Sequence, residues 1–157
     1  MQLVFHPMEN ETAQALRAGG PDAYGLPAER AISDGVGVPC RVCLHDVPRG
    51  AAMLVAAARP FDGLHPYAET GPVFLCAEAC TPWTGAGVPP VLRTSPDYLL
   101  KGYDAEERIV YGTGKVVPRE EIEAYAATLL ADPRVAFVDV RSARNNCWQA
   151  RVRRAAQ

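Results

Sequence analysis

Apolar residues recur at helical spacing in one stretch of the chain. Between residues 118 and 131 they return every three or four positions, which places them on one face of a helix. Pro118 suits the first turn of a helix, and Pro133 pushes the residue before it out of the helical region. The pattern predicts one main helix over about 118–131, with an apolar face formed by Ile122, Tyr125, Ala126, Leu129 and Leu130.

Elsewhere, short apolar and β-branched runs separated by turn residues predict strands. Residues 98–103 and 108–111 are joined by a polar turn and predict a hairpin. Several connections are too short for parallel crossovers, so the sequence predicts a single α+β domain over residues 1–157, with an antiparallel or mixed sheet and the main helix packed on it. The other expected elements are strands over 38–44, 53–58, 72–75, 91–94 and 134–141, and a short helix over 11–17.

The last strand is expected to return as a second hairpin. A three-residue loop over 144–146 gives the hairpin one consistently apolar face, and asparagine tolerates the left-handed backbone that such loops need. A two-residue turn would instead set valines against arginines, and a short helix over 147–154 is the alternative to any strand. The favoured register pairs Val138 with Val152, Val140 with Ala150, Ser142 with Trp148, Asp139 with Arg151, and Arg141 with Gln149.

Composition and charge exclude several classes of protein. The chain is 48% hydrophobic and 22% charged, which is typical of a globular domain. A formal net charge of −2 argues against a dedicated nucleic-acid binder, because phosphate contacts need a basic field. The longest apolar run, 51–58, is far shorter than the roughly 20 residues of a membrane span. The N-terminus has no basic, apolar secretory signal, so the sequence predicts a soluble cytoplasmic protein.

Arginines gather on one face of the predicted C-terminal hairpin. Guanidinium groups in a rigid array suit a carboxylate or phosphate, and the loop at 66–72 could orient the polar groups of such a ligand. The leading functional prediction is therefore a binding protein for a small anionic ligand. The alternative is that Asp139 simply pairs with Arg151 and the other arginines are solvated. The predicted ligand-binding residues are Glu69, Thr70, Arg141, Asn145, Asn146, Gln149 and Arg151, with Arg153 on the same face.

A second hypothesis is an enzyme that uses Cys147 as a nucleophile. Arg144 and Arg151 would favour its thiolate, and the amides of the two preceding asparagines could stabilise an oxyanion. The fold would have to supply a general base, for which the candidates are His6, His45 and His65.

A third hypothesis is an interaction module stabilised by zinc. Five cysteines, an odd number in a chain expected to be cytoplasmic, predict reduced thiols. Cys40, Cys43, Cys76 and Cys80 form two close pairs, the usual arrangement of a structural zinc site, with His45 and His65 in reserve. Residues three apart on a strand face opposite sides, however, and no glycine follows Cys43 to form a tight turn. The predicted strand over 38–44 therefore disfavours zinc.

Five short motifs occur in one order along the chain, and in that order and spacing they resemble a known family. The resemblance is to the bacterial domain of unknown function 1203, over essentially the whole sequence. It implies a small soluble bacterial protein and no particular activity. The motifs are Pro39–Leu44, Pro66–Pro72, Lys101–Asp104, Tyr111–Gly114 and Val140–Cys147.

Overall fold

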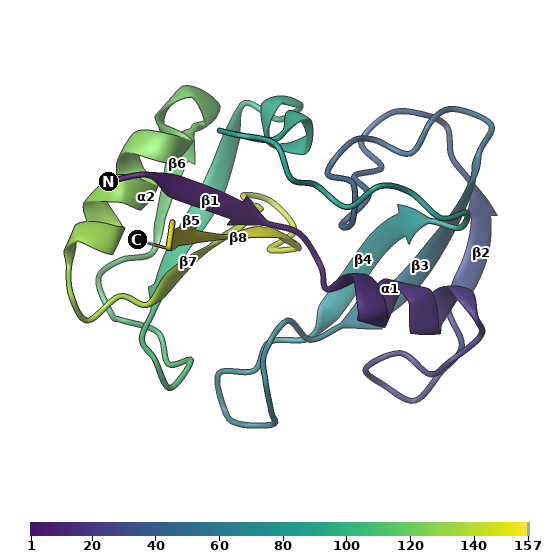
Figure 1. Ribbon diagram of the computed structural model, residues 1–157, viewed down its shortest axis with the longest axis horizontal. Coiled ribbons are helices and arrows are strands. Elements are labelled where there is room, and N and C mark those ends of the chain that lie inside the picture. The colour runs from purple at the N-terminus through teal and green to yellow at the C-terminus, as the bar shows by residue number, and fades with distance from the viewer. Residues whose placement is uncertain (157) are drawn as a thin grey trace. The chain divides into compact units, whose positions relative to one another are not determined.

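The computed structural model describes residues 1–156 and shows two compact units (Figure 1). The N-terminal unit comprises Pro7–Trp83. The C-terminal unit comprises Met1–His6 together with the chain from Thr84 onward. Each unit holds an antiparallel sheet and at least one helix, so the α+β class is confirmed. The prediction of one domain over residues 1–157 stays a prediction.

Three strands form the sheet of the N-terminal unit: β2 (Glu29–Ile32), β3 (Ala52–Ala58) and β4 (Gly71–Cys76). They lie in that order, and both pairings are antiparallel. β3 and β4 confirm the strands predicted over 53–58 and 72–75. β2 escaped prediction because it is exposed at every position and therefore has no apolar alternation.

The helix of this unit is α1 (Asn10–Arg17), which confirms the short helix predicted over 11–17. Its buried residues are Ala13 and Leu16, which lie three positions apart on one face. Arg17 is the last residue of the helix, where a cation interacts favourably with the negative end of the helix dipole.

Five strands form the sheet of the C-terminal unit, in the order β1-β8-β7-β5-β6, and all neighbours are antiparallel. The first and last strands of the chain therefore pair with each other. Two 3-10 helices and one α-helix complete the unit. The bounds are β1 (Leu3–His6), β5 (Asp97–Tyr103), β6 (Lys115–Pro118), β7 (Phe137–Ser142), β8 (Trp148–Arg154), η1 (Pro90–Arg93), η2 (Arg119–Glu121) and α2 (Ile122–Ala131).

Helix α2 with the preceding turn η2 is the main helix predicted over about 118–131. It covers one face of the C-terminal sheet (Figure 1). Four of the five residues of its predicted apolar face are buried, and the fifth, Tyr125, donates its hydroxyl hydrogen to the Thr113 carbonyl at 2.9 Å. The sheet contributes buried residues to the same core, among them Tyr98, Leu100, Val117, Val138 and Val140.

The C-terminal hairpin has the predicted register over most of its length. Val138 faces Val152 and Val140 faces Ala150, as the apolar pattern required. Near the tip a β-bulge sets Arg141 opposite Trp148, so the expected pairs Arg141–Gln149 and Ser142–Trp148 are absent from the described register.

The predicted three-residue loop over 144–146 was wrong, because the tip is closed one residue earlier. The N–H of Ser142 donates to the Cys147 carbonyl at 2.9 Å, and the N–H of Asn146 donates to the Ser142 carbonyl at 3.0 Å. Asn146 has a φ of 57°, the left-handed conformation expected of an asparagine in this loop. The longer loop alone would shift the strand pairing by one residue, and the bulge reverses that shift. The valines therefore remain on one apolar face.

Two further strand predictions were wrong. Residues 90–93 form η1 rather than a strand over 91–94, because two prolines begin the segment and the Tyr98 hydroxyl donates to the Val91 carbonyl at 2.9 Å. Residues 108–111 contain only the isolated bridge of Ile109 to Tyr103. The predicted turn over 104–107 does form, but the strands that pair with β5 are β6 and β7.

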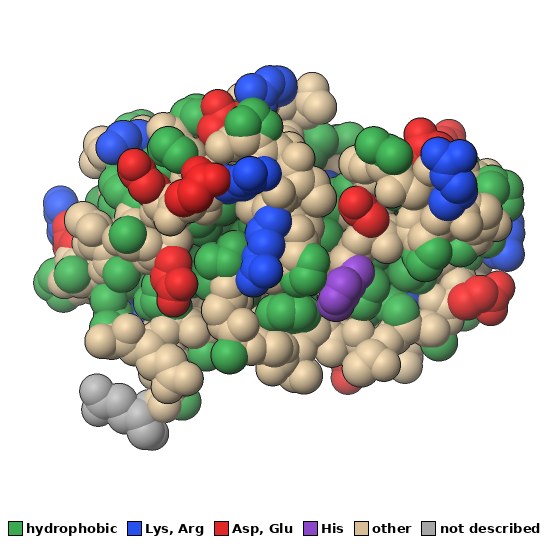
Figure 2. All heavy atoms as spheres, turned by 90° about the horizontal axis from the view of Figure 1, so that it is seen from above, with side chains coloured by type: hydrophobic (Ala, Val, Ile, Leu, Met, Phe, Trp, Pro, Cys, Tyr) green, Lys and Arg blue, Asp and Glu red, His purple; other side chains and the backbone are tan. Residues whose placement is uncertain are grey.

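Within residues 1–156, no helix has the length and apolar character needed to cross a membrane. On the face shown in Figure 2, acidic and basic side chains are interspersed among apolar and backbone atoms. This distribution agrees with the small net charge of −2.

The turn after α2 offers a local test of the electrostatics. Hydrogen bonds to the Asp132 carboxylate lower the pKa of Asp132 from 3.8 to about 2. The Arg134 guanidinium makes the largest contribution and the backbone N–H of Arg134 the next largest. Because the folded pKa is depressed, this contribution to stability is present above the unfolded value and is lost as the pH falls through about 2. In an NMR titration of Arg134→Gln, we expect the Asp132 midpoint to rise toward 3.8 without reaching it, since the backbone N–H remains. An unchanged midpoint would contradict this assignment.

Candidate metal centre

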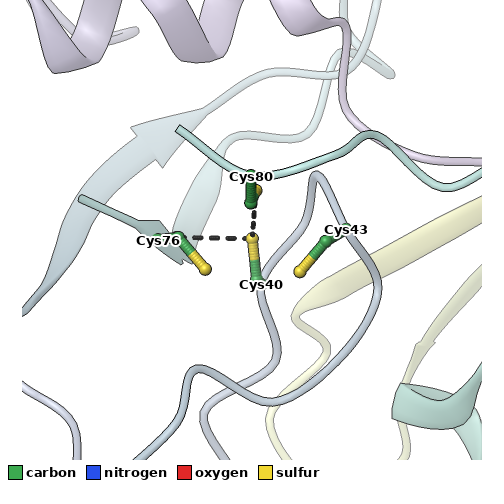
Figure 3. A group of neighbouring side chains, drawn as sticks. All are labelled: Cys40, Cys43, Cys76 and Cys80. Carbon is green, nitrogen blue, oxygen red and sulfur yellow. Dashed lines mark hydrogen bonds between the residues drawn. The ribbon is translucent and has the colours of Figure 1, made fainter. Parts of the chain in front are cut away.

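Four cysteines from two segments meet in the N-terminal unit. The Sγ atoms of Cys40, Cys43, Cys76 and Cys80 all lie within 4.8 Å of one another. Figure 3 shows the four side chains gathered around a common centre, two from a turn and two from the end of β4 and the segment after it. Among the described residues, this is the group that could hold a metal ion.

The first pair lies on a turn, so the strand predicted over 38–44 was wrong. The N–H of Cys40 donates to the His45 carbonyl at 2.9 Å, and the N–H of Leu44 donates to the Cys40 carbonyl at 2.9 Å. These bonds fold the chain back on itself, which brings Cys40 and Cys43 to the same side. The geometric objection to a metal, which assumed an extended strand, therefore falls away.

A leucine occupies the position where a glycine was expected. Leu44 has a φ of 54°, the left-handed conformation that costs a non-glycine residue roughly 1–2 kcal/mol. The Leu44 side chain is fully buried, and burial of a leucine contributes about 1.5–3 kcal/mol. Burial thus offsets the backbone strain, and the turn forms without glycine.

Main-chain hydrogen bonds hold this turn against β4. Cys40 forms a parallel bridge with Phe74, and the N–H of Arg41 donates to the Phe74 carbonyl at 3.0 Å. The Cys40 Sγ atom accepts the N–H of Cys76 at 3.3 Å and the N–H of Val42 at 3.4 Å. Backbone N–H groups directed at a sulfur favour its thiolate form, which is the form that binds metal.

The thiols of this cluster compete for protons. Hydrogen bonds from the Cys43 and Cys76 thiols hold the pKa of Cys40 far below its ordinary value. The same sharing raises the pKa of Cys43 to about 12 and lifts the pKa of Cys76 well above its ordinary value. Like charges this close repel, so the sulfurs become thiolates together only when a cation lies among them.

The second pair is held by β4 and by an arginine. Cys76 is the last residue of β4 and pairs with Met53 of β3. Cys80 lies beyond the strand, in a segment that is neither helix nor strand. The Arg17 guanidinium donates from Nε to the Cys76 carbonyl at 3.0 Å and from one terminal nitrogen to the Cys80 Sγ atom at 3.2 Å.

The spacing of the sulfurs suits zinc. The Cys40 and Cys80 Sγ atoms lie 3.8 Å apart. Tetrahedral zinc with Zn–S bonds of about 2.3 Å separates neighbouring sulfurs by about 3.8 Å. All five cysteines are free thiols, so this contact is not a disulfide.

The two histidines near the cysteine motifs in sequence have other contacts. His45 places Nδ1 2.9 Å from the Cys43 carbonyl, and its ring lies 5.9 Å from that of Trp83. His65 accepts the N–H of Tyr67 at 3.2 Å. The ligand set that the fold assembles is therefore four sulfurs, without His45 and His65, the two reserve ligands considered from the sequence.

Two arginines of the predicted anion site, Arg141 and Arg151, contact other residues of the C-terminal hairpin. Arg151 forms two hydrogen bonds with the fully buried Asp139, at 2.7 and 3.0 Å, and its guanidinium lies 3.7 Å from the centre of the Phe137 ring. Arg141 is buried and donates to the Asn146 carbonyl at 3.0 Å. The pairing of Asp139 with Arg151, the alternative considered from the sequence, is thus present, and the anion site stays a prediction.

Cys147 makes local contacts at the tip of the hairpin. Its N–H donates to the Ser142 hydroxyl at 3.0 Å, and its Sγ atom lies 3.7 Å from the Asn145 carbonyl. Gln149, which is buried, directs its amide toward the Cys147 carbonyl at 3.4 Å. The catalytic role of Cys147 stays a prediction.

Glu69 and Thr70, the remaining predicted ligand-binding residues, belong to the N-terminal unit. Thr70 lines a shallow, mostly apolar hollow of about 280 Å³ together with Tyr24 and Glu29. The predicted arginines belong to the C-terminal unit, so the predicted ligand-binding residues come from both units, and this grouping stays a prediction.

One residue of the candidate centre was missed altogether. Arg17 precedes the first cysteine motif by more than twenty residues, and as the basic last residue of a helix it carries no signal of a metal site. Only the cysteine pairs were visible as a pattern.

Comparisons with known proteins show the family and nothing about the chemistry. The family model described as "Protein of unknown function (DUF1203)" matches residues 37–154, a range that contains all four clustered cysteines. No curated protein and no solved structure matches the chain. Because the matched range is well over half of the sequence, this chain belongs to the DUF1203 family.

Proposed function

We propose that the N-terminal unit is a zinc-binding module in which one Zn²⁺ is held by Cys40, Cys43, Cys76 and Cys80. The observation that carries this proposal is the convergence of four sulfurs within 4.8 Å, although Cys76 and Cys80 follow Cys40 by 36 and 40 residues in sequence. Two close pairs of cysteines joined in this way are the usual ligand set of structural zinc.

The role of the ion is structural. Four protein thiolates complete a tetrahedron and leave no position for water or substrate, whereas catalytic zinc keeps one position open. The unit also needs such support. A core of this size supplies only about 3–5 kcal/mol, and the strand β2 is exposed along its whole length.

Zinc is favoured over iron, the other metal that four thiolates commonly bind. For a given set of ligands, divalent zinc binds more tightly than divalent iron. The zinc would also join the turn that carries Cys40 to the end of β4. Because the metal has no open position for a substrate, the module would present a stable surface rather than carry out a reaction.

Metal analysis tests this proposal directly. We expect purified protein to contain one zinc ion per chain, and the double variant Cys40→Ser, Cys43→Ser to contain almost none, because half of the ligands are lost. Cys147→Ser is the matched control, since this cysteine lies in the other unit and should leave the stoichiometry at one. Iron in place of zinc, or zinc that persists in the double variant, would contradict the assignment.

A further inference from the structure

Three of the four sulfurs belong to residues on a hydrogen-bonded turn or on a strand, and the fourth does not. Cys40 and Cys43 lie on a turn closed by main-chain hydrogen bonds, and Cys76 ends a strand that is paired with β3. Cys80 lies in a segment without helix or strand, four residues after β4. Main-chain hydrogen bonds hold the chain on both sides of Cys80, from the N–H of Ala77 to the Ala52 carbonyl at 3.0 Å and from the N–H of Trp83 to the Val42 carbonyl at 2.9 Å. A further contact is needed to fix the Cys80 sulfur between these two points.

The geometry points to Arg17 as that positioning residue. We infer that the Arg17 guanidinium holds Cys80 in place for the metal and offsets part of the negative charge of the thiolates; this inference rests on the proposed zinc site. The guanidinium spans the Cys76-to-Cys80 segment at both ends, because Nε donates to the Cys76 carbonyl at 3.0 Å and a terminal nitrogen donates to the Cys80 Sγ atom at 3.2 Å.

The planar shape of the guanidinium makes this double contact specific. Its N–H donors form a rigid fork, so fixing one donor on the carbonyl of Cys76 also fixes the direction of the donor that reaches Cys80. Helix α1 supplies a firm base, because Ala13 and Leu16 on the same helix are buried. A lysine has no fork and would retain only the charge.

Charge gives the second part of the argument. Zinc with four thiolates carries a net charge of −2, and a half-buried site makes this charge costly. Arg17 brings a positive charge into hydrogen-bond distance of one thiolate. Groups that hydrogen-bond to metal ligands, without touching the metal, commonly change metal affinity by about 10- to 100-fold.

Zinc competition titrations with a chromophoric chelator test the inference. Arg17→Gln is expected to weaken zinc binding by about 10- to 100-fold. Arg17→Lys should recover part of this loss, because the charge returns without the fork. Arg30→Gln is the matched control. Arg30 contacts Glu78 of the same segment at 3.6 Å, but both side chains are exposed. The zinc affinity of Arg30→Gln should therefore equal that of the wild type.

Cobalt substitution and a double variant distinguish a loss of the Cys80 sulfur from the metal from a general loss of structure in Arg17→Gln. The thiolate-to-cobalt absorption of Arg17→Gln should fall toward that of Cys80→Ser, because the same sulfur leaves the metal in both. In a Cys80→Ser background, Arg17→Gln should cause little further loss of affinity, since the sulfur it positions is already gone.

The outcomes distinguish this inference from the proposed zinc site. Wild-type affinity in Arg17→Gln would overturn the role of Arg17, and so would an equal loss of affinity in the presence and absence of the Cys80 sulfur. A wild-type protein that binds neither zinc nor cobalt would instead overturn the zinc site itself.

Discussion

Removal of zinc is expected to unfold the N-terminal unit. The unit has one short helix and a three-stranded sheet, and the ion would join its two cysteine segments. Structural zinc contributes roughly 10–16 kcal/mol in zinc-finger peptides, which is as large as the whole stability of many domains at about 5–15 kcal/mol. We therefore expect metal-free protein to lose hydrogen-exchange protection in β3, β4 and the turn that carries Cys40.

The two tryptophans allow each unit to be followed separately. Trp83 belongs to the N-terminal unit and Trp148 to the C-terminal unit, and the chain has no others. After a strong chelator is added, Trp148→Phe should show a red shift in the emission of Trp83, and returning zinc should reverse it. Unchanged emission, together with unchanged exchange protection in β3 and β4 of protein shown to be zinc-free, would contradict a structural role for the metal.

Loss of the Asp139 carboxylate is expected to destabilise the protein by about 3–5 kcal/mol. Asp139 is fully buried, and the side chain of its partner Arg151 is only 11% exposed. The variant Asp139→Leu leaves a buried guanidinium without its counter-charge, although the contact of Arg151 with the Phe137 ring remains. Urea denaturation measures the loss.

A double-mutant cycle separates the ion pair from packing. Replacement of both charges, Asp139→Leu with Arg151→Met, should recover most of the stability, because no unpaired charge is then buried. If the double variant loses the sum of the two single losses, the pair is not coupled and this account of the sheet is wrong. The same pair also bears on the predicted anion site, because a ligand anion at Arg151 would have to compete with Asp139.

The elements that could be predicted are those with a strong local pattern. The main helix followed from apolar residues at helical spacing and from the prolines near its ends. Most of the C-terminal register followed from the requirement that valines share one face, since a slip of one residue would move them all. The bulge near Arg141 was beyond prediction, because the apolar pattern is the same whether the extra residue lies in the loop or in the strand.

Long-range contacts explain the failures. Residues 38–44 have the apolar, β-favouring composition of a strand, and nothing local shows that Leu44 will adopt a left-handed conformation. That conformation is stable because the leucine side chain is buried, and burial depends on the rest of the unit. The error over this segment was the premise of the geometric objection to zinc.

The sequence by itself determined the α+β class, the main helix, the pairing of the C-terminal strands and the family, because these depend on periodicity and on ordered motifs. Only the tertiary structure decided that the two cysteine pairs meet, and that Arg17 reaches Cys80 from a helix 63 residues away in the chain. The physical reason is that such convergence requires the chain to close long loops, and the contacts that stabilise the closure are formed by the folded unit as a whole.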